Sequence, residues 1–252
     1  MRVLITNDDG VRSRGLAILR EALRQEHDLW IVAPHVERSG TSHAITLRGA
    51  VKLRQLEDQV YSCDGTPADC VLYANLGAIP IRPDIVVSGI NHGPNIGTDI
   101  IYSGTVGAAR QAALMGYPAI AVSVVDTSTT KGFEFAANFV RENLEQMRLL
   151  WSTEHFWNIN IPGKDGHDGE VSITFPAKRR YNDRLVQFGV PNGDRYLFLD
   201  GEPSDANLEP GSDWEAVVRR RVSVSPIYLH PHNHREVKET EAGDFTATVP
   251  TS

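Results

Sequence analysis

The stretch Arg2-Val3-Leu4-Ile5-Thr6-Asn7-Asp8-Asp9-Gly10 decides the fold class of this sequence. Its first five residues are mostly aliphatic or β-branched, which is typical of a buried parallel strand, and Gly10 supplies the turn that ends it. Open α/β sheets bind ligands at the carboxyl ends of their strands, so Asp8 and Asp9 are candidate site residues. Two close carboxylates repel each other, and a hard divalent cation is the usual relief. From this stretch alone, a pair of helix-capping residues explains the two aspartates equally well.

The sequence that follows alternates predicted strands and helices, which indicates an α/β fold with a mostly parallel sheet. The spacing of Leu16, Leu19 and Leu23 predicts a helix, and an apolar run then predicts a second strand, joined by a right-handed crossover. We expect a Rossmann-like three-layer αβα core over residues 1–162. Its later strands are predicted at 28–33, 84–88, 118–125 and 156–161, the last of these ending the main sheet, with helices at 66–76 and 133–150 and short inserted strands at 44–47, 51–56 and 59–63.

Composition changes after Pro162, where short alternating runs are separated by Gly, Pro, Asn and Asp. Such runs predict β-hairpins, so residues 163–252 are expected to form a hairpin-rich extension. Extended hairpins commonly mediate subunit contacts, which favours a homo-oligomer, either a homodimer or a homotetramer. The runs lie at 171–175, 185–188, 196–199 and 222–228, with a short helix predicted at 213–217.

Charge and composition exclude several classes of function. The 252 residues carry a net charge of −7 and no Lys/Arg block, which argues against a nucleic acid polymer as partner. No apolar run approaches the roughly 20 residues that cross a bilayer, and no signal peptide precedes the first strand, so no membrane partner is expected. Two cysteines, Cys63 and Cys70, fit a reducing compartment. We therefore expect a cytoplasmic protein.

Three polar loops share one edge of the sheet with Asp8 and Asp9, and the first two of them follow predicted strands. The first loop, 35–43, contains Ser39, which could reach the same cation. The second, 89–99, contains Asn91 and Asn95, whose amides offer acceptors for a cation and donors for an anion. The third, 102–109, has the composition of an anion-binding helix N-terminus, although capping alone explains Ser103 and Thr105 equally well. Together the loops favour a ligand site.

Several motifs in order give this chain a resemblance to the SurE family, the stationary-phase survival proteins that act as 5′/3′-nucleotidases. They are Thr6–Gly10, Ala33-Pro34 with Ser39-Gly40, Gly65–Cys70, Val87–Asn91 with Gly93-Pro94-Asn95, Tyr102–Ala109, and Asn160-Ile161-Pro162. The resemblance implies divalent metal ligands at Asp8, Asp9, Ser39 and Asn91. It implies phosphate contacts at Asn95, Ser103, Gly104 and Thr105. One departure is visible at Arg110-Gln111-Ala112, where the family pattern has Met-Glu-Gly, and we expect it to alter packing or an interface.

These observations predict a metal-dependent phosphomonoesterase that hydrolyses nucleoside 5′-monophosphates, with 3′-monophosphates as a second substrate class. Asp8, Asp9 and Asn91 are the predicted catalytic residues, acting with one Mg²⁺ or Mn²⁺ per subunit that lowers the pKa of a bound water. His43, near Ser39 in sequence, is a candidate general acid, although a structural role is the default for such a histidine.

Two alternatives remain open from the sequence. One is a phosphatase that forms an aspartyl-phosphate, as haloacid-dehalogenase-type enzymes do, but those separate their two aspartates by one residue. The other is a nucleotide or phosphate sensor without catalysis. A further pattern, His230-Pro-His232-Asn-His234, is interpreted as an exposed tail and not as a metal site, because spacing alone is weak evidence.

Overall fold

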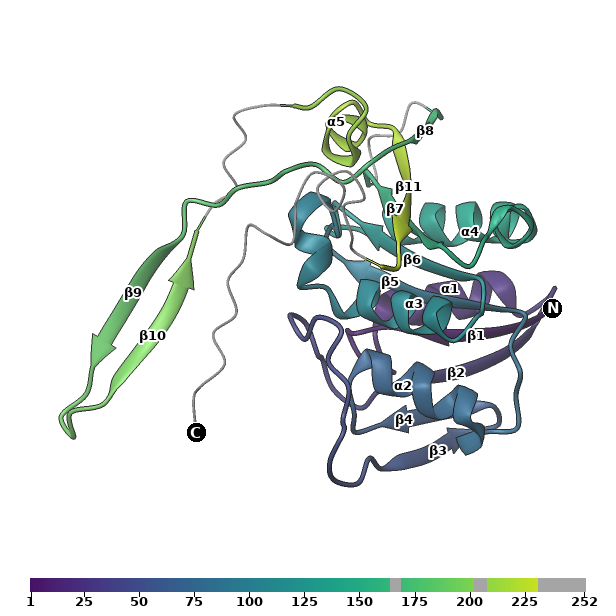
Figure 1. Ribbon diagram of the computed structural model, residues 1–252, viewed down its shortest axis with the longest axis horizontal. Coiled ribbons are helices and arrows are strands. Elements are labelled where there is room, and N and C mark those ends of the chain that lie inside the picture. The colour runs from purple at the N-terminus through teal and green to yellow at the C-terminus, as the bar shows by residue number, and fades with distance from the viewer. Residues whose placement is uncertain (164–168, 202–207, 231–252) are drawn as a thin grey trace, which may run out of the picture.

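A mostly parallel β-sheet organises the molecule, as the opening strand predicts (Figure 1). The computed structural model describes residues 1–163, 169–201 and 208–230. Within these ranges the central sheet has nine strands in the order β3-β4-β2-β1-β5-β6-β7-β11-β8. The strands are β1 (Arg2–Thr6), β2 (Asp28–Pro34), β3 (Leu53–Glu57), β4 (Val60–Cys63), β5 (Ile85–His92), β6 (Ala119–Val124), β7 (His155–Ile161), β8 (Val171–Ile173) and β11 (Val222–Tyr228).

Strand β1 lies inside the sheet, paired in parallel with β2 on one side and β5 on the other. Leu4, for example, is opposite Trp30 in β2 and Val86 in β5. Because parallel strands end on the same edge, the loops that follow β1, β2 and β5 meet there. This edge carries the candidate site.

Helices cover both faces of the sheet, which confirms the predicted three-layer αβα fold. Val3 and Ile5 of β1 belong to a core cluster that includes side chains of α1 and α4, whereas Leu4 faces a second cluster with α2 and α3. No helix in the described ranges is long and apolar enough to span a membrane. The helices are α1 (Arg14–Leu23), α2 (Pro67–Tyr73), α3 (Gly104–Leu114), α4 (Lys131–Leu150) and α5 (Asp213–Val218), with short helical turns η1 (Ala74–Ala78) and η2 (Gly97–Ile101).

The prediction that 156–161 is the last strand of the main sheet is wrong. Strand β11 pairs antiparallel with β7, placing Val224 opposite Ile159, and β8 pairs in parallel with β11. The segments 171–175 and 222–228 are therefore not hairpins of an extension. The alternating pattern wrongly indicated strands with one exposed polar face, because the small polar side chains are buried. The Thr174 hydroxyl contacts those of Ser223 at 2.8 Å and Ser225 at 2.6 Å.

One predicted hairpin does leave the core. Strands β9 (Arg184–Gly189) and β10 (Arg195–Asp200) form a separate antiparallel ribbon that projects from the body of the molecule (Figure 1). Its register pairs Tyr196 with Phe188 and Phe198 with Val186. The hairpin predicted over 185–199 is thus confirmed.

Two further predictions near the site are corrected. Residues 44–47 are not a strand, since Thr46 instead donates two hydrogen bonds to the Asp69 carboxylate, from its N–H at 2.8 Å and its hydroxyl at 2.6 Å. The strand predicted to end at Ser88 continues to His92, with a register shift against β6 between Ser88 and Asn91. The polar loop after this strand is correspondingly shorter than expected.

Candidate active site

The turn after β1 is shaped by Asn7, whose side chain is fully buried. Its amide nitrogen donates to the Gly10 carbonyl at 3.0 Å and to Ser13 Oγ at 2.7 Å. Its amide oxygen accepts from the Gly10 N–H at 3.2 Å. Gly10 adopts φ +101°, a left-handed conformation that favours glycine. The chain therefore leaves strand geometry at Asp8 and Asp9. Their side chains need not point to opposite faces of the sheet, as they would in a strand.

Ser13, and not the aspartate pair, caps the helix that follows. Its Oγ accepts a hydrogen bond from the Leu16 N–H at 3.4 Å, and its backbone is extended as an N-cap requires. The capping explanation of Asp8 and Asp9 is therefore wrong, and both carboxylates are left for another role.

Asp8 lies against the first turn of α3 and is 3% exposed. The hydroxyl of Thr105 donates a hydrogen bond to its Oδ1. The helix approaches so closely that a Cβ on Gly104 would lie 2.9 Å from Asp8 Cβ. Burial raises the pKa of Asp8 above its usual value, although hydrogen bonds from Thr105 and Gly104 oppose the rise. The helix N-terminus that was predicted to bind an anion is therefore in direct contact with Asp8, a predicted cation ligand.

Asp9 is the more perturbed acid. Its burial, and secondly the charge of Asp8, raise its pKa to about 6. The His92 N–H donates to Asp9 Oδ2 at a long 3.4 Å. Each ionised carboxylate thus raises the energy of the other, and a cation bound between them would remove that cost.

Ser39 reaches this edge on a loop that is pinned at both ends. Before it, the Arg38 N–H donates to the Asp8 carbonyl at 2.7 Å, and Ser39 Oγ itself donates to Glu37 Oε1 at 2.9 Å. After it, the Ser42 N–H donates to the Tyr102 carbonyl at 2.9 Å. The loop therefore spans from the end of β1 to the start of α3.

Asn91 lies near the end of β5. Its amide nitrogen donates to the Gly93 carbonyl at 2.8 Å, and the Gly93 N–H in turn donates to the Val124 carbonyl at 2.9 Å. With the nitrogen engaged in the loop, the amide oxygen of Asn91 is the atom with acceptor capacity for a ligand.

Asn95 is held by two buried asparagines of β7. Asn158 and Asn160 donate to its backbone carbonyl at 2.9 and 3.0 Å, and Asn160 Oδ1 accepts from its N–H at 2.8 Å. Its side-chain nitrogen donates to Ser123 Oγ at 2.8 Å. Sequence reasoning assigned no role to these supporting residues. Side chains whose contacts lie more than 60 residues away leave no local signal.

A cavity of about 590 Å³ brings most of the predicted residues together. Asp8, Ser39, Asn91, Asn95 and Ser103 line it, whereas Gly104 and Thr105 contact Asp8 as the first turn of α3. The Ser103 Oγ accepts from the Val106 N–H at 3.0 Å, so Ser103 is the N-cap of α3. The other lining residues are Gly40, His92, Pro94, Asp99, Tyr102, Tyr181, Asp183 and Leu199.

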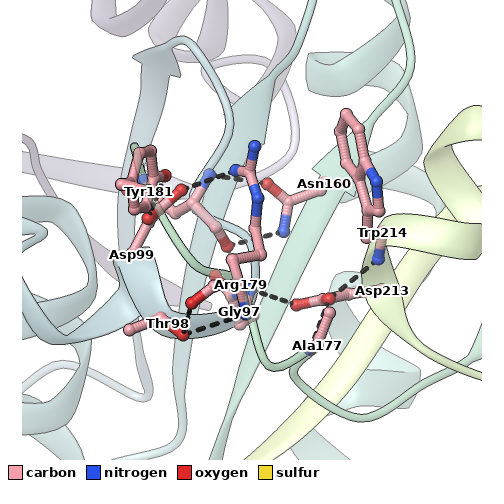
Figure 2. Close-up of polar contacts among 11 residues, drawn as sticks. Gly97, Thr98, Asp99, Asn160, Ala177, Arg179, Tyr181, Asp213 and Trp214 are labelled. Carbon is pink, nitrogen blue, oxygen red and sulfur yellow. Dashed lines mark hydrogen bonds and ion pairs between the residues drawn. The ribbon is translucent and has the colours of Figure 1, made fainter. Parts of the chain in front are cut away.

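Sequence reasoning missed the outer wall of this cavity, which comes from residues beyond Pro162. Asp99 of η2 accepts a hydrogen bond from the Tyr181 hydroxyl and forms an ion pair with Arg179, Nη1 to Oδ2, at 2.7 Å (Figure 2). Burial and the contact with Asp99 raise the pKa of Tyr181 to about 12. The run Arg179-Arg180-Tyr181 was the available signal, but it lies between predicted hairpins and follows no site motif.

His43 is directed at helix α3. Its Nε2 lies 2.9 Å from Gln111 Oε1, and burial lowers its pKa below the usual value. His43 is not among the residues that line the cavity. Gln111, the departure from the family pattern, is therefore the packing partner of the candidate general acid.

The candidate cation site is built from mixed oxygen donors. No group of three or more His, Cys, Asp or Glu side chains that could hold a metal occurs in the described part of the chain. The four predicted ligands carry carboxylate, hydroxyl and amide oxygens, which are hard donors of the kind that Mg²⁺ and Mn²⁺ prefer. Asp8, Ser39 and Asn91 line the cavity, and Asp9 does not. Of the histidine pattern near the C-terminus, His232 and His234 lie outside the described residues.

Comparison with known proteins decides the family. The family model for survival protein SurE matches residues 3–183 of the chain. The chain belongs to the SurE family. A curated relative from Geobacter sulfurreducens, named 5′-nucleotidase SurE, is 40% identical over 259 residues, covering 99% of this chain and 96% of the relative. Another, from Pelobacter propionicus, carries the same name and is 37% identical over 240 residues, covering 94% and 97%.

A solved SurE structure supports the fold. The crystal structure of SurE protein from Aquifex aeolicus superposes with a TM-score of 0.84 at 32% identity, covering 97% of this chain and all of that one. The SurE resemblance recognised from the sequence motifs is therefore confirmed, and the α/β fold with it.

Proposed function

We propose that this chain is a metal-dependent phosphomonoesterase that hydrolyses nucleoside 5′-monophosphates to nucleoside and phosphate. The observation that carries the proposal is the contact of Asp8 with Thr105 and Gly104, which sets a carboxylate beside a helix N-terminus in one cavity. A cation and an anion can bind next to each other only where oxygen ligands for the cation lie beside hydrogen-bond donors for the anion. The 5′-nucleotidase name shared by the SurE relatives supports the activity.

Asp8, Asp9, Ser39 and Asn91 would hold the divalent cation. Their oxygen donors fit Mg²⁺ or Mn²⁺, one per subunit. Burial and the nearby charge of Asp8 raise the pKa of Asp9, and a bound cation would oppose both effects. When bound, such a cation supplies positive charge to phosphoryl oxygens and makes a water molecule more acidic.

The phosphate would lie between Asn95 and the start of α3. The backbone N–H groups of Gly104 and Thr105 already bond the Asp8 carboxylate, so the start of α3 would favour a negatively charged ligand through the positive end of its dipole. The Ser103 hydroxyl accepts from the Val106 N–H and retains its own proton for donation. These groups hold the phosphoryl group in line with its attacking water and stabilise charge that develops during transfer. Asp8, Asp9 and Asn91 would contribute to catalysis by holding the cation.

A phosphate-release assay tests this function. Wild-type protein is incubated with nucleoside 5′- and 3′-monophosphates in Mg²⁺, Mn²⁺ or EDTA, beside Asp8→Asn and the control Asp58→Asn in the β3–β4 turn. We expect release that depends on the metal and that Asp8→Asn lowers on the order of 100-fold, while Asp58→Asn matches wild type. Release by Asp8→Asn at the wild-type rate would place the site elsewhere.

The same assay separates the two rival mechanisms. Nucleotide and metal binding without phosphate release would identify a sensor and overturn the proposed catalysis. A phosphorylated Asp8 or Asp9, trapped by acid quench and found by mass spectrometry, would identify an aspartyl-phosphate enzyme. Against that rival, Asp8 Oδ1 is already engaged by Thr105.

We further propose that the chain forms a homodimer or homotetramer through its projecting ribbon. A two-stranded ribbon is marginally stable alone, and this one exposes large apolar side chains on both faces. Phe188, Tyr196 and Phe198 share one face, where the two Phe rings meet edge to face with centroids 5.8 Å apart. Leu185, Leu197 and Leu199 share the other. A second subunit would cover this surface.

The two cysteines support the expected cytoplasmic location. Cys63 and Cys70 are both buried and are not joined in a disulfide. Free thiols are typical of a reducing compartment.

A further inference from the structure

The cavity has two chemically different ends. Its buried residues are polar and include Asp8, Asn91 and Ser103, where the phosphate and cation are proposed to bind. Its more exposed lining includes the aromatic rings of Tyr102, which is 61% exposed, and Tyr181, beside the carboxylates of Asp99 and Asp183. The volume of about 590 Å³ is typical of sites for whole small molecules and exceeds what a phosphate ion fills. This more exposed lining therefore suits a flat part of a substrate.

Tyr181 is the more firmly held of these two rings. Its hydroxyl donates to Asp99 Oδ1, and the guanidinium of Arg179 lies over its ring, 5.5 Å from the centroid (Figure 2). Because Arg179 is also paired with Asp99 at 2.7 Å, the three side chains form a closed triangle of contacts. An aromatic ring fixed in this way loses little conformational freedom when a ligand packs on it.

Arg179 is braced independently of Tyr181. Its side chain is 9% exposed and stacks on Trp214, 4.7 Å from the centroid. Its backbone N–H and carbonyl both bond Thr98 Oγ1, at 3.1 and 3.0 Å. Its guanidinium thus contacts Asp99 and two aromatic rings, and these contacts hold the outer wall of the cavity in place.

The buried carboxylate of Asp213 connects the segment that carries Arg179 and Tyr181 to the loop that contains Asn95. Asp213 accepts from the Gly97 N–H at 2.7 Å and from the Ala177 N–H at 2.9 Å (Figure 2). The two backbones are so close that a Cβ on Gly97 would lie 2.3 Å from the Ala177 carbonyl oxygen. The outer wall is therefore fixed relative to Asn95, two residues before Gly97.

Building on the proposed nucleotidase activity, we propose that the nucleobase of the substrate stacks on Tyr181, and that Asp99 and Arg179 are positioning residues for its ring. Every base has a π-face, so stacking secures a nucleotide with little regard to base identity. The arrangement predicts that the enzyme prefers nucleotides to phosphorylated sugars while accepting several bases.

The test compares a substrate with a base to one without. Steady-state kinetics are measured on adenosine 5′-monophosphate and ribose 5-phosphate for wild type, Tyr181→Ala, Tyr181→Phe and the control Tyr228→Ala, an exposed tyrosine of β11. Tyr181→Ala should raise the KM for the nucleotide about 10- to 100-fold with little change in kcat, and leave ribose 5-phosphate hydrolysis at the wild-type level. Tyr181→Phe, which keeps the ring but loses the hydrogen bond to Asp99, should raise the KM less than Tyr181→Ala does, and Tyr228→Ala should stay within about threefold.

Arg179→Met and Arg179→Lys test the positioning role. Arg179→Met should raise the nucleotide KM and spare ribose 5-phosphate, and Arg179→Lys should recover part of the loss because it restores a positive charge near Asp99. Equal losses on both substrates in Tyr181→Ala, or a nucleotide KM that does not change, would overturn the proposal.

Binding measurements keep this proposal separate from the proposed activity. If wild type releases phosphate from neither substrate, the nucleotidase function fails, and the stacking site is then judged by calorimetric titration with adenosine 5′-monophosphate. Weaker binding to Tyr181→Ala than to wild type supports the site even without turnover. If Tyr181→Ala binds adenosine 5′-monophosphate as tightly as wild type does, the stacking proposal is wrong.

Discussion

The hydroxyl of Thr105 donates a hydrogen bond to Oδ1 of Asp8, joining the first turn of α3 to the end of β1 across 97 residues of sequence. The contact fixes the orientation of the Asp8 carboxylate against the helix, where a Cβ on Gly104 would lie 3.1 Å from its Oδ2. Asp8 is buried here, so its orientation is set by the protein and not by water.

Thr105→Val should lower kcat/KM for a nucleoside monophosphate about 10- to 100-fold. The variant removes a hydrogen bond to a charged group, worth about 1.5–3 kcal/mol, and leaves the carboxylate with its backbone partners at Gly104 and Thr105. Thr105→Ser keeps the hydroxyl and should retain most of the activity. A valine variant as active as wild type would show that Asp8 needs no such orientation.

Gly104→Ala should impair both activity and stability. The added Cβ would lie 2.9 Å from Asp8 Cβ and 3.0 Å from Thr41 Oγ1, so Asp8 or the helix must shift. Overpacking of this kind costs about 1–3 kcal/mol. Thermal unfolding and kcat/KM measure the two effects, with Gly189→Ala as the control, since a Cβ there meets nothing within 4 Å. Normal kinetics in Gly104→Ala would contradict the close fit described here.

Asp9→Asn should stabilise the metal-free protein while weakening its response to metal. The substitution removes a buried charge and its repulsion from Asp8, which together raise the pKa of Asp9, so we expect the Tm in EDTA at pH 8 to rise by about 3 °C. Saturating Mg²⁺ or Mn²⁺ should raise the Tm of wild type well above its value in EDTA, because a ligand that binds only the folded state stabilises it. The asparagine variant should show a smaller shift. Equal metal-induced shifts would exclude Asp9 from the cation site.

His43→Gln should reduce kcat by less than about tenfold. Its imidazole contacts Gln111, and its lowered pKa means that it is mostly neutral at pH 7, whereas a general acid must carry a proton. The pH profile of kcat is the measurement. A fall of 100-fold or more, with loss of the alkaline limb of the profile, would instead assign His43 the acid role, because such catalysis contributes about 10²–10⁴-fold.

Phe198→Glu should dissociate the proposed oligomer. A charge placed beside Phe188 on the apolar face of the ribbon opposes burial against a second subunit. Sedimentation velocity would show a smaller species than wild type, and Gln55→Glu, an exposed position of β3 outside the ribbon, serves as the control. An oligomer that survives Phe198→Glu would place the interface elsewhere.

Much of the candidate site could be predicted because parallel strands gather their carboxyl ends on one edge. Asp8 follows β1, Ser39 follows β2 and Asn91 lies one residue before the end of β5, so these residues could be placed from their own strands. The contribution of Asp99, Arg179 and Tyr181 could not be predicted in this way. Asp99 and Arg179 are 80 residues apart, and nothing in either neighbourhood specifies the other.

The sequence by itself determined the fold class, the family and the edge of the sheet that carries the chemistry, because buried apolar strands and their polar ends are local patterns. Tertiary structure decided the rest. It showed that Ser13 caps α1 and leaves Asp8 and Asp9 to the site, that Thr105 reaches Asp8, and that β11 extends the main sheet. These outcomes depend on long-range pairing, in which a side chain meets partners chosen by packing and not by sequence neighbours.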